Sequence, residues 1–205
     1  MKIAIIGTGN VGSALARGFR RAGHDVILGS RRPEDSEVRA LAEETGASAA
    51  RPDEAAARAE AVVLAVPWEA AQAAVEGLGD LGGKLLVDAT NPLGPGLALV
   101  ADPSGGEQVA RWAGAGARVV KAFNTIGAEV MAAADRFDPP PVLFLAGDDG
   151  DAKETVALLA AELGFDPIDA GPLRRARHLE HLAVLWIHRA IATGDRRFGL
   201  ALTQG

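Results

Sequence analysis

Three glycines near the start of the chain have the spacing of a phosphate-binding loop. They form a GxGxxG pattern directly after the apolar run KIAII and before the helix-like stretch NVGSALARGFRRAG. Glycines in this arrangement permit a tight turn that brings backbone N–H groups and a helix N-terminus to a pyrophosphate. A second apolar run, HDVILG, follows within about 30 residues, as a βαβ unit requires. The pattern therefore predicts a dinucleotide site formed by Gly7, Thr8, Gly9, Asn10, Val11 and Gly12.

The residues after the second apolar run indicate which dinucleotide would bind. This run ends in Gly29, Ser30, Arg31 and Arg32, where an acidic residue would accept hydrogen bonds from a free ribose. A carboxylate would repel a 2′-phosphate, whereas a hydroxyl and two guanidiniums suit one, because Arg makes bidentate phosphate contacts. The turn therefore predicts NADP(H), with Arg31 the better candidate of the two arginines. The alternative is a pair of solvated arginines at the start of a helix.

Three further segments follow apolar runs and should meet at the carboxyl edge of a parallel sheet. The first contains Val66, Pro67 and Trp68, and Trp68 could either wall the nicotinamide site or pack on the sheet. The other two contain Asn91 and the run Asn124, Thr125 and Ile126. Amide and hydroxyl side chains donate and accept hydrogen bonds without titrating. Val66, Pro67, Trp68 and Asn91 are expected to bind the cofactor, whereas Asn124, Thr125 and Ile126 are expected to position an acceptor ring.

Residues for acid–base, thiol or metal chemistry are sparse. The absence of cysteine and tyrosine excludes a thiolate nucleophile, a disulfide framework and a Tyr–Lys acid pair. Lys121 follows an apolar run and is expected to be a snorkelling side chain. His181 and His188 should lie beside a buried helical stripe and favour a site wall or a dimer contact over a metal pair. That stripe is expected to contain Leu179, Leu182, Ala183, Trp186 and Ala190.

Helix capping, rather than metal binding, explains the acidic residues near the predicted helix starts. Asp148, Asp149 and Asp151 lack the spacing of a calcium loop. Asp151 with Glu154 has the spacing of a capping box, and Asp53 after Pro52 is expected to cap a short helix. We therefore predict no metal site.

Short aliphatic runs alternate with alanine-rich, charged stretches of helix length. Continuous apolar strands are typical of a parallel sheet covered on both faces. The pattern predicts a single α/β domain over 1–205. Its fold is expected to be a Rossmann-type doubly wound, mostly parallel sheet of about eight strands with helices on both faces. The part of the chain from about 140 to 205 is expected to complete the sheet and to form an acceptor crevice. Strands are expected near 2–6, 25–29, 47–50, 61–66, 84–88, 117–123, 141–147 and 167–170. Helices are expected near 11–22, 34–45, 53–59, 68–77, 105–114, 127–134, 151–163 and 173–193.

Composition and charge narrow the possible partners. A net charge of −6 gives no electrostatic footprint for nucleic acid or an anionic membrane. The first apolar run is too short for a signal peptide, and no stretch reaches the roughly 18 apolar residues of a membrane span. We expect a cytoplasmic protein that binds a small redox cofactor and neither nucleic acid nor a membrane. The apolar terminal segment FGLALTQG is expected to dock on the body of the protein or on a partner subunit.

The chain resembles the NADPH-dependent deazaflavin (coenzyme F420) reductases. The resemblance lies in GTGNVG at 7–12, GSRR at 29–32, VPW at 66–68, NTIG at 124–127, GDD at 147–149 and DAGPL at 169–173. It implies that NADP phosphates lie on the glycine loop, that the 2′-phosphate lies on the Ser-Arg-Arg turn, and that the deazaflavin stacks near residues 124–126. It also implies a homodimer. Because hydride passes directly between two stacked rings, no acid–base residue is expected.

The sequence leaves the identity of the second cofactor open. Asn124 replaces a family histidine, and KAFN at 121–124 and DATNP at 88–92 are similar to the cytosolic NADPH:flavin domain of transmembrane ferric reductases. The acceptor could therefore be F420, FMN or FAD, with flavin or ferric reductase-like activity as the alternative. A non-catalytic NADPH-binding sensor is the alternative of another class, but the Gly/Pro-rich segment 93–106 favours an open second site. A hydroxyacid dehydrogenase is disfavoured, because it would need a catalytic pair and a second helical domain.

Overall fold

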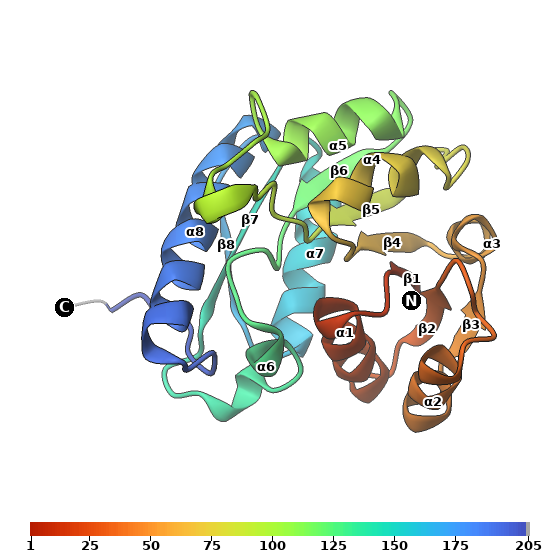
Figure 1. The fold of residues 1–205 in the computed structure, drawn as a ribbon, viewed down its shortest axis with the longest axis horizontal. Helices are drawn as coiled ribbons and strands as arrows, with labels where there is room; N and C mark the ends of the chain where they lie inside the picture. The colour runs from red at the N-terminus through yellow and green to blue at the C-terminus, as the bar shows by residue number, and fades with distance from the viewer. Residues whose placement is uncertain (204–205) are drawn as a thin grey trace.

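The computed structural model describes residues 1–203. Within these residues, eight strands form one sheet in the order β3-β2-β1-β4-β5-β6-β7-β8 (Figure 1). The strands are β1 (Lys2–Ile6), β2 (Asp25–Gly29), β3 (Ser48–Ala50), β4 (Ala61–Leu64), β5 (Leu85–Asp88), β6 (Arg118–Lys121), β7 (Val142–Gly147) and β8 (Asp166–Asp169). The helices are α1 (Asn10–Arg21), α2 (Ser36–Thr45), α3 (Pro52–Arg58), α4 (Trp68–Glu76), α5 (Gly105–Ala113), α6 (Ala128–Met131), α7 (Gly150–Glu162) and α8 (Ala176–Thr193).

Strands β1 to β6 are parallel, and the chain winds outward from β1 in both directions. Strand β7 pairs with β6 in the antiparallel sense, and β8 pairs with β7 in the parallel sense. The carboxyl ends of β1, β4, β5 and β6 therefore share one edge of the sheet, at the point where the strand order reverses. Ligands of doubly wound sheets bind at this kind of edge. The prediction of a doubly wound, mostly parallel sheet is confirmed.

The sheet is buried on both faces, which explains its continuous apolar strands. In β1, Ile3 and Ile5 belong to one core cluster, whereas Ala4 and Ile6 belong to the other. Side chains alternate between the faces of a strand, so both faces need apolar residues. Helices α1, α2, α6 and α7 contribute to the first cluster, and α3, α4 and α5 contribute to the second. None of the helices in the described part of the chain is long and apolar enough to cross a bilayer.

The structure corrects both predicted helix caps. The cap of α7 is Asp149, whose carboxylate accepts a hydrogen bond from the backbone N–H of Ala152 at 2.8 Å. Asp151 lies inside the first turn, because a short turn after β7 starts the helix at Gly150. Helix α3 begins at Pro52, whose fixed φ suits the first helical position, so Asp53 also lies inside the helix and caps nothing. Both acids still lie at the positive end of a helix dipole.

Two segments are less regular than a helix-length pattern indicates. The predicted helix near 127–134 is reduced to the four residues of α6 and a 3₁₀ turn at 134–136. The predicted helix near 173–193 begins with a 3₁₀ turn at 173–175, and α8 starts at Ala176. The Gly/Pro-rich segment between β5 and α5 holds one 3₁₀ turn at 95–97 and one bridge between Leu93 and Leu99.

Candidate functional site

The glycine loop has the geometry that a pyrophosphate site requires. Gly7 has a φ of +104°, and a side chain there would collide with the carbonyl of Ala65. A side chain on Gly12 would collide with the carbonyl of Gly7. A Cβ on Gly9, by contrast, would meet no described atom within 4 Å. Two glycines therefore permit the close packing of the loop, and the third keeps the space above it free for a ligand.

The N-terminus of α1 opens onto this free space. Its cap residue, Gly9, has no side chain to bond the first backbone N–H groups, and the first turn contains no acid. These N–H groups have no carbonyl partner inside the helix, and the helix dipole adds partial positive charge at the same end. Thr8 lies in the loop, where its carbonyl accepts a hydrogen bond from the Ser13 hydroxyl at 2.9 Å. The loop and the helix end fit a pyrophosphate group.

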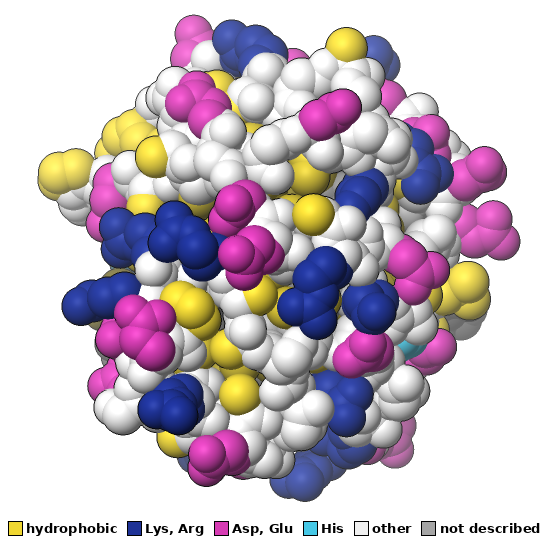
Figure 2. All heavy atoms as spheres, turned by 90° about the vertical axis from the view of Figure 1, so that its right-hand side faces the viewer, with side chains coloured by type: hydrophobic (Ala, Val, Ile, Leu, Met, Phe, Trp, Pro, Cys, Tyr) yellow, Lys and Arg dark blue, Asp and Glu magenta, His cyan; other side chains and the backbone are white. Residues whose placement is uncertain are grey.

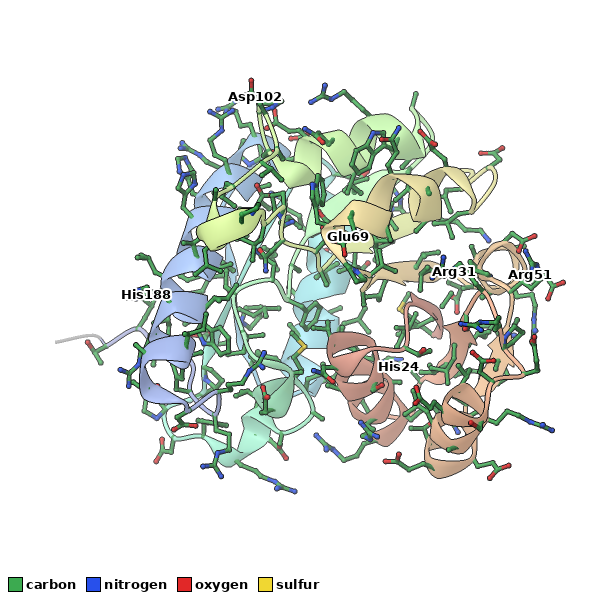
Figure 3. All side chains as sticks on the ribbon, viewed as in Figure 1. His24, Arg31, Arg51, Glu69, Asp102 and His188 are labelled. Atoms are coloured by element: carbon green, nitrogen blue, oxygen red, sulfur yellow. The ribbon has the colours of Figure 1, made fainter. Side chains whose placement is uncertain are left out.

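A pocket of about 420 Å³ lies beside the loop at the end of β2. It is lined by Thr8, Ser30, Arg31, Arg32, Asp35, Ser36, Glu37 and Val38. Arg32 pairs with Asp35 at 3.2 Å. Arg31 is exposed and forms no salt bridge with any residue of 1–203 (Figure 3). Figure 2 shows basic and acidic side chains interspersed over this side of the molecule rather than one positive patch.

The segment after β4 contacts both the glycine loop and helix α5. Val66 lies so close to Gly7 that a Cβ on the glycine would approach its side chain to 3.0 Å. Pro67 is exposed and caps α4. Trp68 is half-buried, and its ring lies 5.3 Å from the ring of Trp112 in α5. The structure therefore gives Trp68 a packing partner and leaves the residue partly exposed.

Asn91 and Asn124 join the strand ends of β5 and β6. The amide of Asn91 donates to the backbone carbonyl of Asn124 at 2.8 Å, and the amide of Asn124 donates to Oδ1 of Asn91 at 3.0 Å. The Oδ1 atom of Asn124 is buried and has no hydrogen-bond partner among the described residues. Because an unpaired buried acceptor is costly, an N–H donor brought by a ligand would stabilise this atom.

The turn before Asn124 is strained, and the core holds it in place. Strand β6 ends at Lys121, two residues earlier than predicted, and Phe123 has a φ of +61°. Bulky residues rarely adopt this region. The buried Phe123 ring makes edge contacts with Phe19 and Phe165, each at 6.2 Å between ring centres. This packing offsets the strain and fixes where the chain leaves the sheet.

Thr125 and Ile126 are buried, and Ile126 belongs to the core cluster around α1 and α6. The terminal segment packs behind them. Phe198 stacks on Trp186 at 4.9 Å between ring centres, and the Trp186 indole N–H donates to the Phe198 carbonyl at 3.1 Å. The predicted docking of this segment on the body of the protein is confirmed for 198–200, whereas residues 204–205 lie outside the described residues.

Lys121 is not a snorkelling side chain, which corrects the prediction. Its exposed fraction is 0%, and its ammonium lies 2.9 Å from the Asp88 carboxylate and 3.2 Å from the Glu180 carboxylate. Snorkelling needs a path to water, whereas this lysine is enclosed by β5, α5 and α8. The sequence predicted no role for Asp88, although it lies in the DATNP segment, and none for Glu180. Glu180 could have been found from the spacing of Ala176, Glu180 and Ala183, which places it on the buried face of α8.

The histidines of α8 lie away from the buried group formed by Lys121, Asp88 and Glu180. His181 and His188 are exposed, while the predicted stripe faces inward, with Leu182 half-buried. Within residues 1–203, no group of three His, Cys, Asp or Glu side chains is arranged to hold a metal ion. Figure 3 shows His188 on the outer side of α8, far from Arg31.

Asp169 lies in the DAGPL segment, at the end of the edge strand β8. Burial raises the pKa of Asp169. Hydrogen bonds from Lys153 and from the backbone of Gly171, together with the Lys153 charge, lower the pKa by more than burial raises it, so the net shift is downward. The Lys153 ammonium lies 2.7 Å from this carboxylate. The pair ties α7 to β8 and has no contact with the predicted cofactor residues.

The strand order, the glycine loop and the basic turn after β2 together define a dinucleotide-binding protein of the Rossmann class. Residues 2–92 match the family described as NADP oxidoreductase, coenzyme F420-dependent. The chain is 34% identical to the F420-dependent NADP reductase of Methanothermobacter thermautotrophicus, and the alignment covers 100% of this chain and 95% of that protein. The chain therefore belongs to the family of F420-dependent NADP reductases, and the predicted resemblance is confirmed.

Two further comparisons extend this result. A crystal structure from Arthrobacter sp. FB24, named as a "putative f420 dependent nadp-reductase", has a TM-score of 0.90 and 34% identity, with 100% of both chains covered. Metalloreductase STEAP3 of Rattus norvegicus is 34% identical over 181 residues, which are 87% of this chain but 36% of that protein. The second predicted resemblance, to the NADPH:flavin domain of ferric reductases, is therefore also found.

Proposed function

We propose that this protein transfers a hydride between NADPH and coenzyme F420. The observation that carries the proposal is a full-length match to F420-dependent NADP reductases, in a chain whose glycine loop and Ser-Arg-Arg pocket fit NADP(H). When bound, the dihydronicotinamide supplies the hydride and the deazaflavin ring accepts it. The protein contributes binding and orientation, so the absence of tyrosine and cysteine is no obstacle to the reaction.

The glycine loop and the pocket beside it would hold the NADP(H) phosphates. Backbone N–H groups of residues 8–12 bind the pyrophosphate at the N-terminus of α1. The guanidinium of Arg31 and the hydroxyl of Ser30 bind the 2′-phosphate, and Arg32 assists while paired with Asp35. Val66, Pro67 and Trp68 border the nicotinamide end.

We assign the positioning of the acceptor ring to Asn124, Thr125 and Ile126. Asn91, which the sequence predicted as a cofactor residue, is reassigned here as their support, because its side chain bonds to Asn124. The free Oδ1 of Asn124 accepts a hydrogen bond from a ring or carboxamide N–H, which fixes the orientation of that ring. Ile126 supports this segment from the core side, because its side chain belongs to the core cluster. Holding two rings in a reactive geometry can lower the activation free energy by several kcal/mol. No residue here needs to gain or lose a proton.

A flavin acceptor is the second candidate function. Asn124 stands where the deazaflavin family has histidine, and STEAP3 aligns with 87% of this chain. NADPH:FMN or FAD reduction, or ferric reductase-like activity, would use the same NADP(H) half of the site. The two candidates differ only in the ring that enters the acceptor side.

Stopped-flow absorbance tests these candidates directly. NADPH oxidation is followed in a single turnover with saturating oxidised F420, FMN or FAD in parallel. Fast transfer to F420 alone supports the proposal, and fast transfer to a flavin supports the second candidate. Tight NADPH binding without transfer to any acceptor would favour a sensor and contradict both.

We also propose that residues 1–205 act as one NADP(H)-binding domain in a cytoplasmic homodimer. The continuous sheet from β3 to β8 supports the single domain. Leu185 and Ile191 on α8 are 68% and 70% exposed, which supports an apolar contact with a second copy. Light scattering after size exclusion tests the dimer, and Leu185→Glu should shift it to the monomer mass.

A further inference from the structure

A closed ionic network lies directly beneath the Asn91–Asn124 pair. Asp88 and Lys121 are partners in register on neighbouring strands, and both are fully buried. The Lys121 ammonium donates hydrogen bonds to Asp88 at 2.9 Å and to the Thr90 carbonyl at 2.6 Å, and it forms an ion pair with Glu180 at 3.2 Å. A buried charge is tolerated only when it is fully paired in this way.

The two carboxylates are also satisfied. The second oxygen of Asp88 accepts hydrogen bonds from the backbone N–H of Thr90 at 2.9 Å and from its hydroxyl at 2.7 Å. Glu180 accepts from the N–H groups of Gly105 and Gly106, at 3.1 and 3.0 Å, where helix α5 begins. The positive end of the α5 dipole offsets the excess negative charge of the cluster. A side chain on Gly105 would approach the Glu180 carboxylate to 2.9 Å, so the site also depends on that glycine.

This network holds the two backbone segments that carry the acceptor site. Asn91 lies three residues after Asp88, and Asn124 lies three residues after Lys121. The side chain of Asp88 fixes the backbone of Thr90, and the ammonium of Lys121 binds the carbonyl of the same residue. The residue before Asn91 is therefore bonded to both strands, whereas none of these contacts reaches the glycine loop or the pocket at Arg31.

We propose that Lys121, Asp88 and Glu180 are positioning residues for hydride transfer, which set the placement of Asn91 and Asn124 without contributing to NADPH binding. This inference rests on the proposed function, because it deepens the role given there to the acceptor side of the site. A well-packed apolar core could stabilise the same strands at least as well as a buried ion pair. Directional hydrogen bonds, however, fix the strand ends in a single arrangement, which apolar packing specifies less strictly.

The test uses Glu180→Gln in the full-length protein. The amide is almost isosteric, but its NH₂ group would face either the Gly105 N–H or both the Gly106 N–H and the ammonium, so at least one contact of the network is lost. Thr90→Val is the second variant, because it removes only the hydroxyl donor to Asp88. Lys153→Met is the matched control, since it breaks a Lys–Asp pair of 2.7 Å between α7 and β8 that shares no residue with the network.

Two measurements separate positioning from a merely structural role. The first is the ¹H–¹⁵N NMR signal of the Asn91 and Asn124 side-chain amides in the ligand-free protein, which needs no acceptor. The second is the single-turnover rate of NADPH oxidation by F420, measured beside the NADPH dissociation constant. We expect Glu180→Gln and Thr90→Val to shift or broaden both amide signals and to slow transfer at least about tenfold, because small misplacements of reacting groups are costly. NADPH affinity should stay within about twofold, and Lys153→Met should change none of these quantities.

Three results would overturn the proposal. One is an unchanged transfer rate in a folded Glu180→Gln or Thr90→Val variant. Another is an equal loss of NADPH affinity and transfer rate, which would mean that the network supports the whole fold. The third is unchanged Asn91 and Asn124 amide signals. If the wild-type protein does not reduce F420, the proposed function fails, and the amide signals still decide whether the network positions the pair.

Discussion

The guanidinium of Arg32 lies 3.2 Å from the Asp35 carboxylate, while its neighbour Arg31 has no such partner within residues 1–203. The charge of Arg31 is therefore available to a 2′-phosphate, and the charge of Arg32 is already partly neutralised. This difference ranks two adjacent arginines that the sequence alone separates only weakly.

We predict that Arg31→Ala weakens NADPH binding by about 1.5–3 kcal/mol, because a charged hydrogen-bonded partner is lost. NADH has no 2′-phosphate, so its affinity should hardly change, and Arg32→Ala should have the smaller effect on NADPH. Fluorescence titration of both nucleotides measures the affinities. Arg51→Ala is the control, since Arg51 is an exposed arginine outside the pocket (Figure 3). Equal weakening of NADPH and NADH would remove the phosphate role of Arg31.

Substitutions of the loop glycines should separate effects on stability from effects on NADPH binding. In Gly9→Ala the new methyl meets no protein atom, so the free energy of unfolding should change by less than about 1 kcal/mol. The methyl occupies the space that a pyrophosphate must enter, so NADPH affinity should fall at least tenfold, about 1.4 kcal/mol. Gly12→Ala collides with the Gly7 carbonyl and should cost about 1–3 kcal/mol of stability. Urea unfolding and NADPH titration check both variants, and wild-type affinity in Gly9→Ala would count against the loop.

The Asn91–Asn124 pair should act as a unit. Asn91→Ala and Asn124→Ala are each expected to slow hydride transfer while NADPH affinity stays within about twofold. Because each amide bonds to the other residue, the double variant should show a coupling energy of about 0.5–3 kcal/mol. Single-turnover kinetics give the three rates. Gln72→Ala, which removes an exposed amide on α4, serves as the control. Strictly additive effects would show that the two residues act separately.

The docked terminal segment should contribute to stability. Phe198→Ala removes the stack on Trp186 and the cation–π contact with Arg189 at 4.9 Å. The expected loss is about 1–2 kcal/mol of unfolding free energy, with a change in tryptophan fluorescence. Leu202→Ala, at an exposed position of the same segment, should leave the stability unchanged. A Phe198→Ala variant as stable as the wild type would show that the docking carries no energy.

Much of the fold followed from apolar periodicity, because a parallel sheet covered on both faces requires continuous apolar strands separated by helices. Errors occurred where a single residue decides the boundary. Strand β6 stops at Lys121 although Ala122 and Phe123 are apolar, because Phe123 turns the chain with a positive φ that only its packing against Phe19 and Phe165 sustains. The cap of α7 moved from Asp151 to Asp149 because the length of the preceding turn, which sequence spacing does not state, sets the first helical residue.

The sequence by itself was sufficient to predict the NADP(H) half of the proposed site. A turn, a helix N-terminus and a basic pocket are built from neighbouring residues, so the GxGxxG spacing and Ser30–Arg32 already contain the chemistry. Only the tertiary structure decided the role of Lys121. Its partners Asp88 and Glu180 lie far from it along the chain, on another strand and on the last helix. A lone lysine after an apolar run predicts a side chain that reaches solvent. Only long-range packing can bring two carboxylates to a buried ammonium and make its burial stable.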